Sequence, residues 1–427
     1  IKKLSKEIKK QVEEINKLSL QEQTEKLLTL APKLLEEPTK KQIKSLPTLK
    51  KPVTLRFEPS PSGALHIGHA FVLSLNELIR KKHNGKLILR IGDTNPGNIN
   101  KQAYKLIKED AKWLTKISKT YIQSDRLKIY YKYAEKVLKL KKAYICTCSP
   151  EYFRQLRNKS ESCKCRNLKI KKQLEKWKLM FTKYKPGEAV YRIKTDLKNK
   201  NPALRDWPAF RISDTKHERQ KNKYRVWPLM NFAVAIDDHE MKVTATIRAK
   251  DHMDNAKRQK YLLNYLKWKQ PQHLFVGRIN FKGFELSTSK TAQLIKNKKY
   301  KNWDDIRLPF LPALRKRGYQ KQALLKFAKE TGITETDKTV SKEDFFKMIN
   351  KFNTEVIDQK ANRYFFIDNP KKIKIKNAPK LNVNLDLYPK KRKGGRIFKT
   401  SDEFYISDNL EKDKPYRLMN LFNFINK

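Results

Sequence analysis

The stretch that most constrains the fold of this chain is 53–91, where an apolar strand, a tight loop, a helix and a second strand follow one another. The strand patterns are 53–57 (Val-Thr-Leu-Arg-Phe) and 86–91 (Lys-Leu-Ile-Leu-Arg-Ile), and 70–84 between them follows a helical pattern that ends at Gly85. Two strands joined by a crossover helix form a parallel pair, and ligands bind at the carboxyl ends of such strands. The sequence therefore predicts an α/β domain with a nucleotide site at this loop.

The loop itself carries two of the chain's seven histidines, in the order His66-Ile67-Gly68-His69. Backbone N–H groups and the helix dipole face an anion at such a helix N-terminus, which suits a nucleotide phosphate. The two imidazoles can donate to phosphate oxygens, and Gly68 leaves room for an adenine ring against the backbone. A His-X-X-His tetrapeptide alone is most often a surface or core pair, but the strand, loop and helix around it favour a phosphate site.

The charge of the chain indicates a polyanionic partner. Its 98 Lys and Arg outnumber 44 Asp and Glu, for a formal net charge of +54 over 427 residues. A tRNA, DNA, the ribosome or an acidic membrane would each fit this charge, and an AT-rich genome would produce part of the same excess. We find no apolar run of about 18 residues and no signal peptide, so we expect a cytoplasmic protein of two to four domains without a membrane span.

All the cysteines of the chain lie in one cluster, Cys146-Thr147-Cys148 and Cys163-Lys164-Cys165. Two close pairs of thiolates can supply the four tetrahedral ligands of a structural Zn²⁺, because four protein ligands close the site. In a reducing cytoplasm this is favoured over disulfides. The alternative is a set of buried free cysteines. We expect Cys146, Cys148, Cys163 and Cys165 to bind zinc.

Several long motifs resemble one enzyme family. The stretch 59–69 resembles the His-Ile-Gly-His signature of class I aminoacyl-tRNA synthetases. The segments 201–207 (Asn-Pro-Ala-Leu-Arg-Asp-Trp), 236–252 and 303–309 (Trp-Asp-Asp-Ile-Arg-Leu-Pro) are similar to glutamyl- and glutaminyl-tRNA synthetases. They follow the family's order over roughly 18–417 and resemble the archaeal and eukaryotic type of glutamyl-tRNA synthetase. The resemblance implies ATP-dependent ligation of L-glutamate to the 3′ end of tRNA(Glu) through glutamyl-adenylate, with release of AMP and pyrophosphate.

The resemblance also implies where ATP and its Mg²⁺ bind. The loop Glu285–Lys290 is loosely similar to the family's second phosphate loop, Lys-Met-Ser-Lys-Ser, with Thr288 where the second lysine usually lies. His66, His69 and Lys290 are the expected catalytic residues: the imidazoles stabilise the reacting phosphate, and Lys290 or the loop backbone stabilises pyrophosphate. The expected ATP-binding residues are Pro59, Ser60, Pro61, Ser62, Gly63, His66, Ile67, Gly68, His69, Leu286, Ser287, Ser289 and Lys290.

A glutamate pocket needs cations for two carboxylates. Arg56 and Arg248 fall at the family's substrate arginines, and the planar guanidinium binds a carboxylate with two hydrogen bonds. One departure concerns Gly92, which replaces the carboxylate expected near the substrate ammonium; either Asp93 or Ser60 takes over, or activation is weak. Met230 sits where many relatives have an aromatic residue. The expected amino-acid-binding residues are Arg56, Ser60, Asp93, Met230 and Arg248.

The implied fold is a Rossmann-like parallel sheet split by an α+β insertion and followed by a helical domain and an incomplete C-terminal β-barrel. The apolar runs 232–236 and 243–247 are expected as later strands of this sheet, and 371–376 and 381–387 as a hairpin. The expected segments are 1–50, an N-terminal helical segment and linker; 51–145 and 201–283, the two halves of the catalytic domain; 146–200, the zinc insertion that receives the tRNA acceptor end; 284–364, the signature loop and helical domain; and 365–427, a partial anticodon-binding barrel.

Other readings remain open. Glutaminyl-tRNA synthetases share the fold and most motifs, and tRNA(Gln) is a possible further substrate. A relative that modifies a tRNA base is disfavoured by the helical and β segments after Trp303. A non-catalytic tRNA-binding protein is a third reading. The chain begins with Ile rather than Met, so we expect part of its N-terminus to be missing. It stops before the family's second barrel would be complete, so we expect either a fragment, or a remaining part that is lost or supplied by a partner chain.

Overall fold

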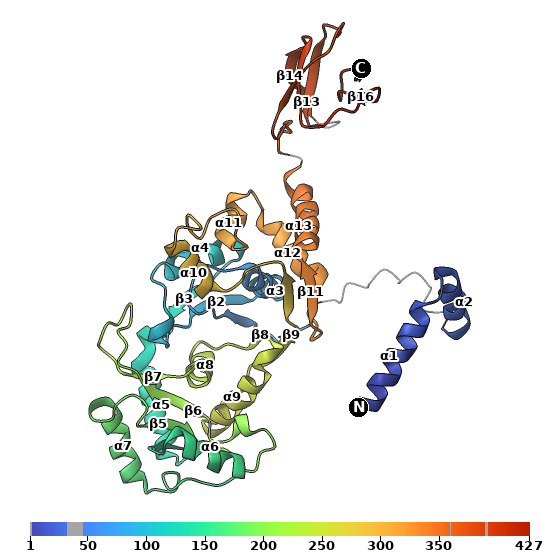
Figure 1. Cartoon of the computed structure of the whole chain (residues 1–427). Coiled ribbons are helices and arrows are strands. Elements are labelled where there is room, and N and C mark those ends of the chain that lie inside the picture. Colours follow the sequence, from blue (N-terminus) through green and yellow to red (C-terminus); the bar gives the residue numbers. More distant parts are fainter. Residues whose placement is uncertain (1, 32–45, 359, 389–391) are drawn as a thin grey trace. The chain divides into compact units, whose positions relative to one another are not determined.

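The computed structural model describes residues 2–31, 46–358, 360–388 and 392–427 (Figure 1). The chain divides into two compact units, 1–45 and 46–427. The first contains helices α1 (Lys2–Asn16) and α2 (Leu20–Leu30), and Ser19 caps α2 in a reciprocal pair with Glu22. None of the side chains of α2 is buried. The predicted N-terminal helical segment is thus present, while 32–45, which include the first half of the predicted linker, lie outside the described residues.

The second unit is built on parallel strands. Strands β1 (Thr54–Phe57), β2 (Lys86–Ile91) and β3 (Lys119–Ile122) form one parallel ladder, and β8 (Ala245–Ala249) and β9 (Gln272–Val276) form another. The ladders adjoin at Thr54 and Thr244, since the Thr244 N–H donates to the Thr54 carbonyl at 2.9 Å. Helices α3 (Ile67–His83), α4 (Ala103–Leu114) and α9 (Met253–Tyr265) connect consecutive strands. The predicted parallel α/β sheet is confirmed.

The connection from α3 to β2 explains why a glycine follows the helix. Asn84 ends α3 in the left-handed conformation (φ 49°), which asparagine tolerates better than most residues. At Gly85 the chain then passes so close to the residue before β1 that a Cβ would lie 2.6 Å from the Val53 carbonyl oxygen. Leu55, Leu87 and Leu89 can therefore pack without exposure under the helix.

An antiparallel sheet is inserted between β3 and β8. Its strands run in the order β4 (Ala143–Cys146), β5 (Val190–Ile193), β6 (Pro208–Ile212) and β7 (Val226–Pro228). Helices α5 (Leu127–Lys139), α6 (Pro150–Lys159), α7 (Ile170–Thr182) and α8 (Met230–Glu240) accompany it. Aromatic side chains fill its core, for example Trp177 and Phe210 with ring centroids 5.4 Å apart. The α+β insertion is present, and the exact domain boundaries stay predictions.

One predicted strand of the sheet is wrong. Residues 232–236 lie inside helix α8, where every residue from Asn231 to Asp238 is buried. A short continuous apolar run fits a buried strand and a helix buried on all sides equally well, so periodicity could not separate them. The other run, 243–247, does contribute a strand, which begins two residues later, as β8.

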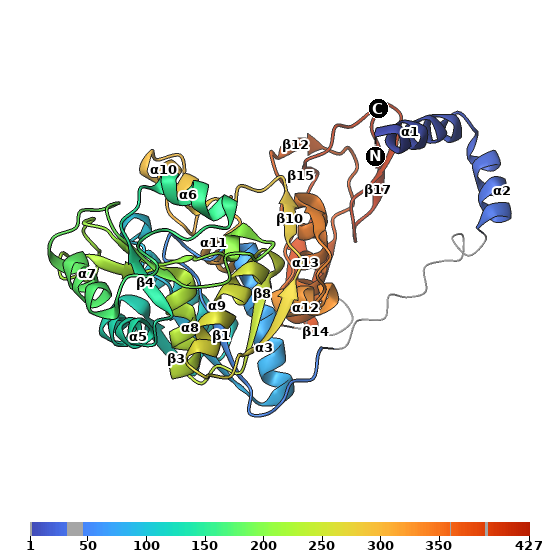
Figure 2. The same ribbon diagram turned by 90° about the horizontal axis from the view of Figure 1, so that it is seen from below.

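A helical region follows the sheet. Strand β10 (Ile279–Lys282) pairs in parallel with β11 (Lys338–Ser341), and between and after them come α10 (Thr288–Lys296), α11 (Leu311–Lys316), α12 (Lys321–Thr331) and α13 (Lys342–Ile357). Figure 2 shows α12 and α13 side by side. Phe327 of α12 packs on Phe71 of α3 and on Phe345 of α13. The region is thereby joined to the hydrophobic core of the parallel sheet.

The described C-terminal strands form three separate antiparallel pairs. They are β12 (Lys371–Lys374) with β15 (Glu403–Ile406), β13 (Asn382–Tyr388) with β14 (Arg392–Lys399), and β16 (Pro415–Arg417) with β17 (Asn423–Ile425). The predicted hairpin of 371–376 with 381–387 is wrong in its pairing, because alternation identifies a strand but not its partner. These described strands do not close into a barrel, so the predicted partial barrel is not confirmed.

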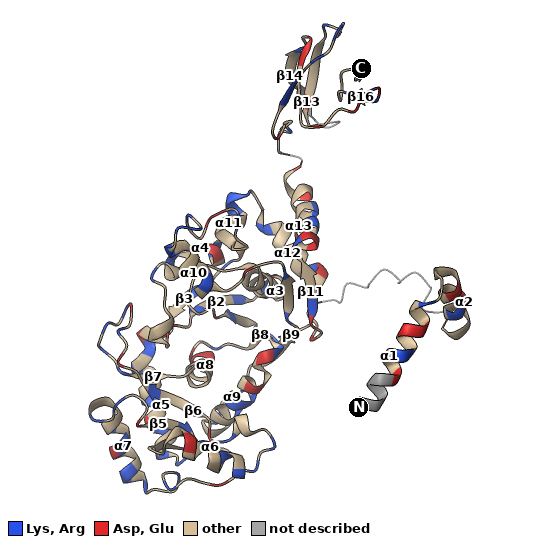
Figure 3. Cartoon of the chain, in the orientation of Figure 1, with Lys and Arg blue, Asp and Glu red and all other residues tan. Residues whose placement is uncertain are grey.

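Basic side chains are spread along the chain rather than gathered on one element (Figure 3). The same spread is visible in the sequence, where Lys and Arg occur from the first residues to the last. Every described helix is either too short or too polar to cross a lipid bilayer.

The loop before α3 packs against a distant tryptophan, and this contact gives a first prediction. A Cβ at Gly63 would lie 2.4 Å from Cη2 of Trp303, which is buried at 2% exposure. We expect Gly63→Ala to lower the free energy of unfolding by about 1–3 kcal/mol, because overpacking forces the ring and the loop apart. Denaturant unfolding would measure this loss in the free energy of unfolding. Gly97→Ala is the control, since its Cβ would come no nearer than 4.0 Å to another atom; equal effects of both changes would contradict the prediction.

Candidate active site

A cavity of about 570 Å³ opens at the carboxyl ends of the parallel strands. Arg56 and Glu58 reach it from the end of β1, Gly92 from the end of β2, and Arg248 from β8, while Met230 contributes from the first turn of α8. This is the edge at which parallel α/β sheets bind ligands. The topology thus brings together residues that lie nearly 200 positions apart in the sequence.

Three buried guanidinium groups share one carboxylate beside the cavity. Asp238 accepts hydrogen bonds from Arg56 Nε at 3.2 Å and from Arg90 Nη2 at 2.7 Å, and Arg248 Nη2 lies 3.6 Å from its other oxygen. Burial opposes ionisation of Asp238, but Arg56, Arg90 and Arg248 outweigh it and lower its pKa to about 2. Asp238 is therefore a fixed anion that orients all three arginines.

Arg248 has hydrogen-bond donors that no described residue accepts. Its side chain is buried, yet its Nε and Nη2 have no hydrogen-bond partner among the described residues. Burial, and then the nearby charge of Arg56, lower its pKa to about 9. Buried donors are normally paired, and a carboxylate is the strongest partner for a guanidinium. The cavity is therefore chemically suited to an anionic ligand at Arg248.

The loop before α3 presents its histidines as part of the helix cap. Nδ1 of His66 accepts from the backbone N–H of Gly68 at 3.1 Å and of His69 at 3.4 Å, and Nδ1 of His69 accepts from the His66 N–H at 3.4 Å. The two rings stack with centroids 3.8 Å apart. Because each Nδ1 is an acceptor, each neutral ring carries its proton on Nε2 and has that N–H to donate.

Both imidazoles are held in the neutral form. Burial, with a smaller contribution from the neighbouring His69, lowers the pKa of His66 to about 2. Burial lowers the pKa of His69 to about 4. At neutral pH the rings thus contribute hydrogen-bond donors rather than positive charges, and the positive end of the α3 dipole lies directly behind them.

The second predicted loop lies against the first. The hydroxyl oxygens of Ser62 and Thr288 are 2.9 Å apart. Ser287 caps α10 by accepting from the Lys290 N–H at 3.3 Å, and the Lys290 ammonium pairs with Glu285 at 2.5 Å. The side chain of Lys290 is largely exposed in this arrangement. The two loops are therefore in contact, with Lys290 paired at the surface.

The predicted residues divide into two groups. Those that line the cavity are Arg56, Pro59, Ser60, Ser62, His69, Met230 and Arg248. Those that lie outside its lining are Pro61, Gly63, His66, Ile67, Gly68, Asp93, Leu286, Ser287, Ser289 and Lys290. Most of the second group belong to the two loops beside the cavity.

Asp93 does not face the cavity. One carboxylate oxygen accepts from the Ser124 N–H at 2.8 Å, and the other accepts from the hydroxyls of Ser124 at 2.7 Å and Tyr104 at 2.8 Å. Both oxygens are therefore engaged within the protein, and Asp93 is 1% exposed. These contacts fix the turn after β2 and leave this carboxylate no room for a substrate ammonium.

Sequence reasoning missed Glu58 and Gln123, both of which line the cavity. A signal for Glu58 existed, because side chains two positions apart at a strand end point to the same side, and Arg56 was already a candidate. Nothing in the sequence marks Gln123. Its place follows from the end of β3 reaching the same edge of the sheet.

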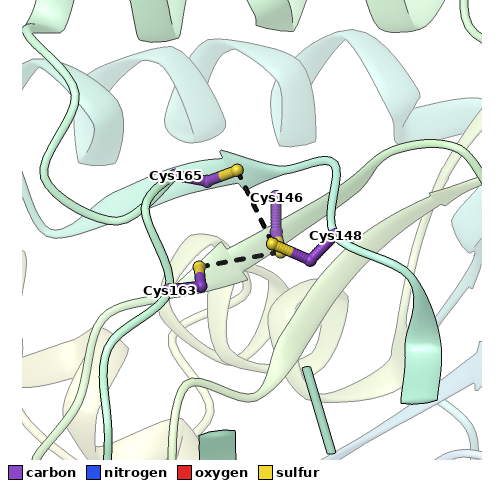
Figure 4. A group of neighbouring side chains, drawn as sticks. All are labelled: Cys146, Cys148, Cys163 and Cys165. Atoms are coloured by element: carbon purple, nitrogen blue, oxygen red, sulfur yellow. Dashed lines mark hydrogen bonds between the residues drawn. The ribbon is translucent and has the colours of Figure 1, made fainter. Parts of the chain in front are cut away.

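The four cysteine sulfurs point toward one another (Figure 4) and lie within 4.8 Å of each other. Cys146 and Cys163 are 3.9 Å apart, as are Cys148 and Cys165, which is far beyond disulfide bonding distance. A tetrahedral zinc with Zn–S bonds of about 2.3 Å separates its sulfurs by about 3.8 Å. The cluster therefore fits a zinc ion.

The surroundings of Cys165 favour its thiolate. Hydrogen bonds from Cys146 and Cys163, and then from Thr147, lower the pKa of its thiol, while hydrogen bonds with Cys163 and Cys165 raise the pKa of Cys146, so one thiolate is shared within the cluster. The Lys176 ammonium lies 3.9 Å from its sulfur. A thiolate is the form that binds a metal.

Comparison with known proteins places this geometry in a family. Residues 52–359 match the family described as tRNA synthetases class I (E and Q), catalytic domain, and residues 361–427 match the anti-codon binding domain of the same family. The chain is 42% identical to the glutamate–tRNA ligase of Methanocaldococcus jannaschii, over 98% of this chain and 75% of that one. It is also 42% identical to the glutamate–tRNA ligase of Methanosphaera stadtmanae, over 97% of this chain and 75% of that one.

Among solved structures, the fold is similar to a glutamate tRNA ligase from Elizabethkingia meningosepticum in complex with its amino acid. The TM-score is 0.52 at 21% identity, and the match covers 73% of this chain and 70% of that chain.

The neutral histidines give a prediction for the pH dependence of stability. In the unfolded chain both imidazoles bind protons below about pH 6.5, whereas the native rings resist protonation down to about pH 4 and about pH 2. The unfolded state thus binds more protons in this window, and the free energy of unfolding falls as the pH falls below 6.5, by roughly 1 kcal/mol per pH unit for each ring.

His66→Asn isolates this effect, because asparagine also caps a helix. We expect denaturant unfolding curves to show a smaller loss of stability between pH 7 and pH 5 for the variant than for the unchanged protein, with equal slopes above pH 7. Identical acid sensitivity would contradict a neutral, desolvated His66.

Proposed function

We propose that this chain, which belongs to the class I tRNA synthetases of the E and Q family, ligates L-glutamate to the 3′ end of tRNA(Glu) at the expense of ATP. The observation that carries this proposal is the cavity at the strand ends, which is lined both by the buried Arg248, with its unpartnered donors, and by His69 of the histidine-capped helix α3. One part of the site suits a carboxylate, and the neighbouring part suits a phosphate.

The reaction has two steps. A carboxylate oxygen of glutamate attacks the α-phosphorus of ATP, the bond from that phosphorus to the bridging oxygen breaks, and pyrophosphate leaves. The terminal ribose hydroxyl of the tRNA then attacks the acyl carbon, and AMP leaves as the ester forms. Neither step needs a covalent bond to the protein, whose residues orient the reactants and stabilise charge. Mg²⁺ is expected to arrive with ATP, coordinated mainly by phosphate oxygens and water.

The nucleotide part of the proposal rests on the loop and cap of α3. His66 and His69 donate their Nε2–H groups to phosphate oxygens as negative charge builds up, and the helix N-terminus adds its backbone N–H groups. The contact between Ser62 and Thr288 supports a role for the second loop at the same nucleotide, with Lys290 leaving Glu285 to reach pyrophosphate. Loss of either imidazole is expected to lower the rate roughly 10²–10³-fold.

The amino-acid part rests on the arginines. Arg56 and Arg248 line the cavity, and Asp238 holds both from behind. We assign them to the two carboxylates of glutamate, with Ser60 and Met230 completing the wall. Glutamine would leave one guanidinium facing a neutral amide. The arrangement therefore favours glutamate over glutamine. The family match alone leaves both amino acids open, because the family includes synthetases for glutamate (E) and for glutamine (Q).

The tRNA part rests on the family match of 361–427 to an anticodon-binding domain and on the net charge of +54. We propose that β12 to β17 belong to a barrel that meets the anticodon, and that the cysteine-bearing insertion receives the acceptor end. Charging of tRNA(Gln) and a cytoplasmic location stay predictions.

Aminoacylation with labelled amino acids tests the function directly. Purified protein is combined with ATP, Mg²⁺ and either tRNA(Glu) or tRNA(Gln), and with either labelled glutamate or labelled glutamine. We expect labelled glutamate on tRNA(Glu). Preferential transfer of glutamine would favour the alternative, and tRNA binding without any charging would indicate a non-catalytic protein.

Arg248→Gln tests the carboxylate site. We expect KM for glutamate to rise about 10- to 100-fold, because a charge-assisted hydrogen bond contributes about 1.5–3 kcal/mol, while KM for ATP changes little. Arg278→Gln is the matched control, since Arg278 is exposed and does not line the cavity. An equal rise in KM for ATP and for glutamate would instead indicate a general disturbance of the site.

The cysteine cluster is proposed to hold a structural zinc ion. We expect about one zinc per chain by elemental analysis, and less in Cys163→Ser. Removal of the metal by a chelator should increase hydrogen exchange around 142–166 while leaving β1 and β2 protected, because the ligands tie only this part of the insertion together. Protein from zinc-supplemented growth that contains no metal and four reactive thiols would contradict the proposal.

A further inference from the structure

An α-amino acid in this cavity brings a positive ammonium group as well as carboxylates. Removing an ammonium from water is costly unless an anion or several acceptors replace the water. The cavity lining carries the cations Arg56, Arg211 and Arg248, and among its described residues Glu58 is the one acidic side chain. If a zwitterion binds here, Glu58 is its available counter-charge.

The contacts of Glu58 hold one oxygen and leave the other available. Oε2 accepts from Arg90 Nη2 at 2.7 Å and lies 3.5 Å from Arg56 Nε. Arg90 is fully buried and is itself bound to Asp238 at 2.7 Å, so this end of the carboxylate is fixed. No described residue donates a hydrogen bond to Oε1. The arginines therefore fix Glu58 through Oε2, while Oε1 can still accept a hydrogen bond from a ligand.

Gly92 provides the open space beside this oxygen. A Cβ at position 92 would lie 3.8 Å from Glu58 Oε1 and 3.4 Å from Gln123 Oε1. The Nε2 of Gln123 donates to Asp237 at 3.1 Å, which turns its Oε1 away from that bond as a free acceptor. Glu58, Gln123 and Gly92 all line the cavity. Two acceptor oxygens thus converge over a residue that has no side chain to fill the space.

We propose that Glu58 Oε1 and Gln123 Oε1 bind the α-ammonium of the amino-acid substrate above Gly92. The carboxylate absent at position 92 is supplied from the end of the neighbouring strand, β1, and Asp93 is not needed for this contact. The inference rests on the proposed function in one respect, that the substrate is an amino acid. It adds a specificity: the site distinguishes glutamate from a dicarboxylic acid without an amino group.

Equilibrium binding of two ligands to the full chain tests the proposal. Glutarate has both carboxylates of glutamate and no ammonium. By calorimetry we expect Glu58→Gln to weaken binding of L-glutamate about 10- to 100-fold and to leave binding of glutarate unchanged within about twofold. Equal weakening of both ligands would overturn the inference, because Glu58 would then act only by supporting Arg56 and Arg90.

A second variant keeps the test decisive if Glu58→Gln disturbs the arginine cluster. Gly92→Asp, added to Glu58→Gln, places a new carboxylate close to the same space, and the 3.4 Å contact with Gln123 is tolerable. We expect it to recover at least part of the lost affinity for glutamate and none for glutarate. Failure of the unchanged protein to bind either ligand would overturn the proposed function, whereas normal binding by that protein with no selective loss in Glu58→Gln would overturn this inference alone.

Discussion

The structure of the site depends on the carboxylate of Asp238. This one anion, on helix α8, binds arginines from the ends of β1 and β2 and lies beside a third from β8. Each guanidinium would be costly to bury alone, and together they would repel one another. Replacing Asp238 would remove the one carboxylate that all three arginines share and leave Glu58 and Asp237 to compensate them. Asp238 therefore contributes to both the shape and the charge of the cavity.

The loop that precedes α3, where we propose that phosphate binds, is held in place by residues far away in the sequence. The loop before α3 is fixed by residues about 240 positions later: the Ile67 N–H donates to the Pro309 carbonyl at 3.1 Å, and the Leu311 N–H donates to the Leu65 carbonyl at 2.8 Å. Phe310 also packs edge-on against the ring of His66. The segment after α10 is therefore part of the scaffold of the site, although none of its residues lines the cavity.

The sequence predicted those features of the structure that depend on residues close together in the chain. The βαβ unit around α3 followed from periodicity and from the residues that start and end the helix, and the cysteine spacing predicted a cluster whose sulfurs do converge. The helix at 232–236, the partners of the C-terminal strands and the inward turn of Asp93 depend on packing between distant segments. Gln123 was missed for the same reason, since only the assembled sheet brings it to the cavity, whereas Glu58 carried a local signal two positions from Arg56 that was not used.

The contact between the two loops has a further consequence. Ser62 and Thr288 meet through uncharged hydroxyl groups, and a hydrogen bond between neutral groups responds little to dissolved ions, whereas attraction of a polyanion to a strongly basic chain is screened steeply. The contact between the loops and the attraction of RNA thus depend on interactions of different kinds. A change in the ionic medium is therefore expected to loosen the hold on the RNA while leaving the hydrogen bond between the two loops nearly unchanged.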